Sequence, residues 1–136
     1  MKLFLLAILI GQLAIVGFAH DDHDHEAAVE AAPHGGILRN APPYKSELVL
    51  NKDLAKIFVY DKDVKPVAKE KLKNTIKGTL AFPKDKQKRE VVFKLTGDAY
   101  EAKLSGIDKV HRYDLHVTLE VDGKAILADF GVDNIH

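Results

Sequence analysis

In the last third of the chain the hydrophobicity of the residues repeats with a strict period of two, and this pattern restricts the possible folds more than any other. Apolar side chains alternate with polar ones along residues 113–121. Such alternation is typical of a strand in an antiparallel sheet that has one face in the core and one in solvent. Asp122-Gly123 and a second apolar run, residues 125–130, follow. A two-residue Asp-Gly link predicts a β-hairpin, because its turn needs the positive φ that glycine accepts.

Similar short runs recur between residue 37 and the C-terminus, and turn residues separate them. They cover residues 44–50, 57–60, 75–82, 91–95 and 99–104. Only residues 67–74 are compatible with a turn or two of helix. We therefore predict an all-β fold, an Ig-like antiparallel β-sandwich of about seven to eight strands over residues 37–136. The alternative is a small β-barrel.

The beginning of the chain has the pattern of a secretory signal peptide. Met1-Lys2 is basic, residues 3–18 are almost all apolar, and Ala19 ends a small-residue exit. The apolar run is shorter than the ~20 residues that a membrane-spanning helix needs. We expect residues 1–19 to be a cleaved signal peptide, with no stable membrane insertion afterwards and a periplasmic or secreted location.

Composition excludes several classes of function. The 136 residues carry 20 basic and 20 acidic side chains, so a zero formal net charge gives no indication of a nucleic-acid partner. The absence of cysteine excludes disulfides, thiolate metal sites and cysteine nucleophiles. Neither Ser46 nor Ser105 lies in a nucleophile elbow, and no phosphate-binding loop or zinc-protease motif occurs. We expect no enzymatic activity.

The histidines are the most distinctive candidate functional residues in the sequence. Three of them lie with three aspartates in a short segment made up of His20, Asp21, Asp22, His23, Asp24 and His25. Imidazole nitrogen and carboxylate oxygen are ligands for Zn(II) and Cu(II). The segment has too little apolar surface to offset the ~1–2 kcal/mol per residue that ordering a backbone costs. Residues 20–36 are therefore predicted to be a flexible tail that captures metal, with an acidic solubilising linker as the alternative.

Three further histidines are candidate ligands. His34 precedes two glycines at the junction of the tail and the first strand, where its ring is accessible. His111 and His116 flank the strand at 113–121, and their odd separation places them on opposite faces of a regular strand. Each can also be an ordinary surface histidine. Protons compete for imidazole nitrogens, so metal affinity should fall as the pH drops through the imidazole range near ~6.5.

A basic stretch follows Pro83. It contains Lys84, Lys86, Lys88 and Arg89. We interpret it as a solvated hairpin loop that protects a sheet edge. The alternative is a docking patch for an acidic partner or for anionic lipid head groups.

Four segments carry a resemblance to a known family. They are Pro33-His34-Gly35-Gly36-Ile37-Leu38, residues 44–50 with an acid inside an apolar run, residues 57–67, and the late strand opened by His111. Together they resemble a small periplasmic β-domain that occurs near, or fused to, the adaptor (membrane fusion) subunits of heavy-metal efflux pumps. The resemblance implies periplasmic export, divalent-metal handling, a periplasmic efflux component as partner, and functional roles for His34 and His111.

The sequence thus predicts an exported protein that binds a divalent transition metal, Cu(II) or Zn(II), and buffers it or hands it on as an accessory to metal efflux. Two alternatives stay open. One is a protein-interaction β-sandwich with incidental histidines. The other is a copper-dependent oxidative enzyme in which His20 becomes the N-terminal residue and chelates Cu(II) through its amine and its imidazole.

Overall fold

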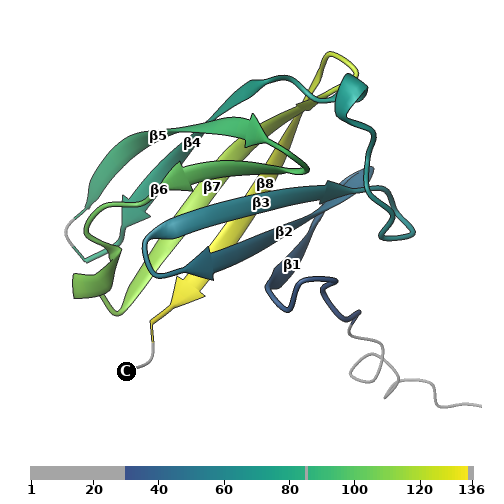
Figure 1. The fold of residues 1–136 in the computed structure, drawn as a ribbon. Helices are drawn as coiled ribbons and strands as arrows, with labels where there is room; N and C mark the ends of the chain where they lie inside the picture. Colours follow the sequence, from purple (N-terminus) through teal and green to yellow (C-terminus); the bar gives the residue numbers. More distant parts are fainter. Residues whose placement is uncertain (1–29, 85, 135–136) are drawn as a thin grey trace, which may run out of the picture. The chain divides into compact units, whose positions relative to one another are not determined.

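A computed structural model of the chain describes residues 30–84 and 86–134, and the folded unit begins at Ala31. Eight antiparallel strands form one sheet in the order β1-β2-β3-β6-β5-β4-β7-β8 (Figure 1). The strands are β1 (Ile37–Ala41), β2 (Tyr44–Asn51), β3 (Leu54–Tyr60), β4 (Thr75–Phe82), β5 (Gln87–Thr96), β6 (Ala99–Lys103), β7 (Arg112–Val121) and β8 (Lys124–Asp133). The outermost strands, β1 and β8, lie against each other, so the sheet is nearly closed. The all-β prediction is confirmed, and the small barrel is the predicted architecture that this single sheet fits.

The β7–β8 hairpin forms where the sequence predicts it. Val121 pairs with Lys124 across the two-residue turn. Asp122 and Gly123 both have positive φ, 53° and 78°, as a primed turn requires. The stretch predicted as a short helix, residues 67–74, contains only the 3-10 turn η2 (Lys69–Lys71). A second such turn, η3 (Ile107–Lys109), precedes β7.

The inward-facing side chains form the main core. Along β7, residues 113, 115, 117, 119 and 121 are all buried, which is the predicted apolar face. Aromatic rings from other strands, including Phe93, Tyr100 and Phe130, fill the same interior. No helix within residues 30–84 and 86–134 is long and apolar enough to cross a membrane.

Tyr113 leaves a polar group in this apolar interior. Its side chain is fully buried, and its hydroxyl oxygen has no hydrogen-bond partner among the described residues. Burial raises the pKa of Tyr113 to about 12. An unsatisfied buried hydroxyl costs free energy, whereas a phenylalanine ring of the same shape does not.

We therefore expect Tyr113→Phe to raise the free energy of unfolding by about 1 kcal/mol. Urea denaturation of the wild type and the variant measures this difference. Tyr44→Phe is the control, since that tyrosine lies partly exposed on β2 and its hydroxyl can be hydrated. A loss of stability in Tyr113→Phe would show that the hydroxyl has a partner in solution.

A smaller apolar cluster lies on the outer face of the sheet. It contains Phe58, Tyr60 and Ala99, with Leu38, Val49 and Val64 packed around them. In the strand register, Leu38 pairs with Glu47 and Glu47 pairs with Phe58. Directly paired residues share a face of the sheet. Because the adjacent Leu48 and Ile57 belong to the main core, these three side chains point outward.

Candidate functional site

Glu47 is the centre of a hydrogen-bonded cluster on this outer face. The side chain of Glu47 is fully buried, in a stretch of β2 that is buried on both faces of the sheet. Its Oε2 accepts bonds from the backbone amides of His34 (3.0 Å) and Gly36 (2.8 Å). Its Oε1 accepts a 2.6 Å bond from the Tyr60 hydroxyl and lies 3.2 Å from His34 Nδ1. We call Glu47, His34, Gly36, Phe58 and Tyr60 the Glu47 cluster.

Two glycines bring His34 into this position. Gly35 has a φ of +74°, which favours glycine, and its amide bonds to the Ala32 carbonyl at 3.0 Å to close a turn. Gly36 passes so close to β2 that a Cβ atom there would lie 2.3 Å from the Leu48 carbonyl oxygen. Residues 34–36, which the sequence assigns to the tail, are therefore hydrogen-bonded to the folded domain.

The surroundings keep Glu47 ionised. Burial alone would raise the pKa of its carboxyl, but the bonds from Tyr60, Gly36 and His34 together outweigh burial and lower that pKa. Burial and the adjacent Glu47 carboxylate, with a smaller contribution from Asp98, raise the pKa of Tyr60. The cluster therefore holds one negative charge on Glu47 and a neutral Tyr60 hydroxyl.

These contacts fix the proton on the imidazole of His34. The single hydroxyl proton of Tyr60 is donated to Glu47, so the Tyr60 oxygen accepts the 3.0 Å bond from His34 Nδ1. An ionised carboxylate also only accepts hydrogen bonds. Both partners thus require a proton on Nδ1. In the neutral imidazole, the lone pair is then on Nε2.

The ring of His34 is held in place while one side of it faces solvent. The imidazole stacks on Phe58 with a centroid distance of 3.8 Å and an interplanar angle of 10°. The side chain is still 45% exposed, and no described residue forms a hydrogen bond with Nε2. A small cavity of about 60 Å³ beside the ring is lined by Tyr60, Val67 and Asp98 as well. The arrangement provides one oriented nitrogen that can bind a metal ion or accept a proton.

The other candidate histidines of the described region lie elsewhere. His116 is exposed on β7, and its Nδ1 lies 2.7 Å from Asp129 Oδ1 on β8. His111 is exposed just before β7, and its carbonyl accepts a bond from the Asn134 amide. Residues 30–84 and 86–134 contain no group of three histidine or acidic side chains placed to hold a metal, so His34, His111 and His116 do not form one site.

The predictions for the beginning of the chain fall outside the described residues. They concern the signal peptide at residues 1–19 and the ligands His20, Asp21, Asp22, His23, Asp24 and His25. The proposed His20 amine chelate falls there as well. All of these stay predictions.

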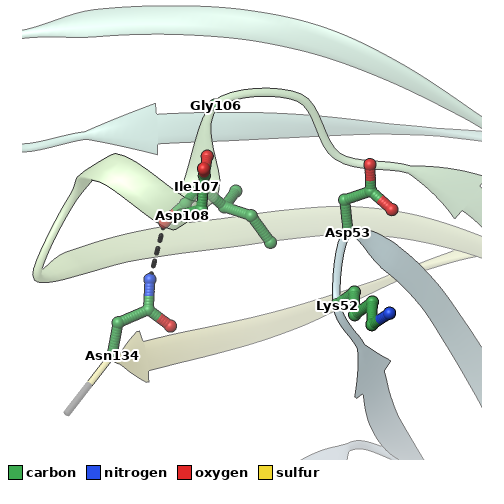
Figure 2. A pocket seen from close by; sticks show the side chains of 6 residues that line it. All are labelled: Lys52, Asp53, Gly106, Ile107, Asp108 and Asn134. Atoms are coloured by element: carbon green, nitrogen blue, oxygen red, sulfur yellow. Dashed lines mark hydrogen bonds between the residues drawn. The ribbon is translucent and has the colours of Figure 1, made fainter. Parts of the chain in front are cut away.

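A larger cavity of about 440 Å³ lies at another part of the domain, beside the β2–β3 turn and η3. Figure 2 shows the side chain of Asn134 bonded to a carbonyl of η3, and this Nδ2 donates to Ile107 (2.7 Å) and Val110 (2.9 Å). Asp53 has its carboxylate 3.6 Å from Lys103 Nζ. These interactions hold the end of β8 and the β2–β3 turn in place, so a structural role accounts for the polar groups at this cavity.

The sequence did not single out Glu47 or its partners Phe58 and Tyr60 as site residues. Glu47 occupies an outward position in an alternating strand, which normally indicates a solvated carboxylate. The available signals were the acid inside an apolar run and the two glycines after His34. No family model, curated protein or solved structure matches this chain. The resemblance to efflux-associated domains therefore rests on the motifs alone and stays a prediction.

Proposed function

We propose that this protein binds a divalent transition metal, Cu(II) or Zn(II), reversibly, with His34 Nε2 as the ligand on the folded domain. The observation that carries the proposal is the hydrogen bonding of His34 Nδ1 to the buried Glu47 and to Tyr60. A metal-binding histidine usually donates its other ring N–H to a carboxylate, which fixes the tautomer and the orientation of the ring. In the proposal, the exported protein buffers the ion or passes it to an efflux component.

Preorganisation supports a role for His34 over the other exposed histidines. Its ring is stacked on Phe58, and its backbone amide bonds to the same carboxylate as its side chain. The ring therefore loses little freedom when Nε2 binds an ion, so less binding energy is spent on ordering. His116 also has a carboxylate partner, but that Asp129 side chain is 66% exposed and is not held in a comparable network.

One imidazole is not a complete site, because Zn(II) takes four ligands. In the proposal, His20, His23 and His25 and the aspartates between them collect ions, and His34 holds one or passes it on. His25 is nine positions before His34, and a nine-residue link can span up to ~30 Å. Ligands tethered this closely act at a high effective concentration. The sequence predicts that this segment is flexible, and a flexible segment that is ordered on binding loses affinity, which suits exchange of the ion better than permanent storage.

Equilibrium dialysis of residues 20–136 at neutral pH tests this function. The two apolar cores lie within residues 31–134, so this chain contains the whole folded unit. We expect the protein to retain Cu(II) or Zn(II), and we expect His23→Ala combined with His25→Ala to weaken retention by about 10-fold or more.

The two possible failures are distinguishable. Unchanged retention in the double variant would contradict the role of the His-rich segment while leaving His34 to be tested. Absence of retention in the wild type would contradict metal binding altogether. It would favour the protein-interaction alternative.

A further inference from the structure

A cavity between the end of β4 and the entrance of β7 combines positive charge with an apolar wall. Its volume is about 510 Å³, and Phe82, Lys84, Lys109, Val110 and Arg112 are among the residues that line it. We propose that this cavity binds an organic anion that carries a carboxylate on an apolar body. The proposal is independent of metal binding at His34.

The positive charge of the cavity is only partly neutralised by the protein. Arg112 is paired with Asp133 at 2.9 Å and lies 3.6 Å from Asp114. Lys84 and Lys109 form no ion pair with any residue of the described ranges 30–84 and 86–134. These two ammonium groups come from segments that are far apart in the sequence, and the fold brings both to one cavity. An anion placed there would be attracted by both of them.

The apolar wall is fixed by the fold. Phe82 is 3% exposed, and the guanidinium of Arg89 lies 4.8 Å from the centre of its ring. Arg89 is itself held by a 2.9 Å bond to the Ser105 carbonyl. Val110, directly after η3, packs against the main core. Two residues of the basic stretch after Pro83 therefore have different roles. Arg89 supports the fold, and Lys84 lines the cavity.

The combination favours an amphipathic ligand over a simple inorganic anion. Cavities that take small organic ligands have volumes of roughly 300–1,000 Å³ and mostly apolar walls with a few polar groups. Lysine is a flexible point charge and does not form the rigid donor fork that holds a phosphate by geometry. Neither the charge nor the apolar contact alone provides much affinity, so a ligand that uses both should bind best.

NMR titration of amide-labelled residues 20–136 with octanoate, 1-octanol and inorganic phosphate tests the proposal. We expect octanoate to shift the amides of residues 82–84 and 109–112 and to bind about 10-fold more tightly than either other probe. Lys84→Gln combined with Lys109→Gln should weaken octanoate binding by about 10-fold. The matched control, Lys77→Gln with Lys94→Gln, removes two exposed strand lysines and should leave binding unchanged.

Three results would overturn the proposal. Equal binding of octanoate and 1-octanol would show an apolar surface without charge selectivity. Equal binding of octanoate and phosphate would show charge attraction only. Shifts that map to other residues, or that weaken equally in both double variants, would place the anion elsewhere.

Discussion

Glu47→Leu is expected to lower the free energy of unfolding by about 3–5 kcal/mol, which is among the largest effects of any single side chain outside the main core. The change removes the acceptor for the amides of His34 and Gly36 and for the Tyr60 hydroxyl. Each buried donor left without a partner costs about 1–3 kcal/mol. Urea denaturation of residues 31–136 measures the loss.

A matched control separates this effect from the loss of a surface charge. Glu101 is also on an outer strand position, where it lies 3.6 Å from Lys56 as a partly exposed ion pair. Exposed pairs contribute about 0–1 kcal/mol, so Glu101→Leu should change stability little. Glu47→Gln keeps one acceptor oxygen, so its loss of unfolding free energy should lie between the losses of the two leucine variants. Equal losses for Glu47→Leu and Glu101→Leu would contradict the structural role of the Glu47 cluster.

The same carboxylate predicts how stability changes with pH. The pKa of Glu47 is lower in the folded protein than its ordinary value. The ionised carboxylate therefore stabilises the fold above that ordinary pKa, and this contribution is lost as the pH falls through the lowered pKa. The stability difference between the wild type and Glu47→Gln should narrow on acidification below about pH 4. A stability difference that stays constant down to pH 2 would contradict the lowered pKa of Glu47.

If His34 is the metal ligand that we propose, His34→Ala should weaken Cu(II) or Zn(II) binding by about 100-fold, because it removes a ligand that the fold holds in position. His116→Ala is the matched control. Both rings have Nδ1 beside a carboxylate oxygen, and their side chains are exposed to a similar extent, 45% and 51%. We expect His116→Ala to change affinity by less than about 2-fold. Calorimetric titration of residues 20–136 measures both, and equal losses would contradict a special role for His34.

The strands could be predicted from the sequence because their signal is local. Alternation along residues 113–121 fixes which side chains face the core, and Asp122-Gly123 fixes the turn. Local patterns could not show whether the strands form a two-sheet sandwich or one nearly closed sheet. That choice depends on β6 pairing with both β3 and β5, and on β1 approaching β8, which are contacts between distant segments.

Only part of the Glu47 cluster could be predicted from the sequence. His34 was predicted as a candidate ligand, because the two glycines after it leave its ring accessible at the start of the domain. Glu47 was not, because an acid on the outer face of a strand normally faces water. Gly36 allows the preceding segment to lie against β2, where the amides of His34 and Gly36 bond to the carboxylate of Glu47. The parity argument for His111 and His116 assumed one regular strand, but β7 begins at Arg112, so His111 lies just before it.

The proposed metal binding requires that His34 present an unprotonated Nε2 to the ion. Nitrogen NMR of the histidine rings in residues 20–136 tests it directly, before and after addition of Zn(II). We expect the neutral ring of His34 to carry its proton on Nδ1, and Zn(II) to shift Nε2 while Nδ1 keeps that proton. A proton on Nε2 in the free protein, or a His34 ring that does not respond while His23 and His25 bind Zn(II), would contradict it.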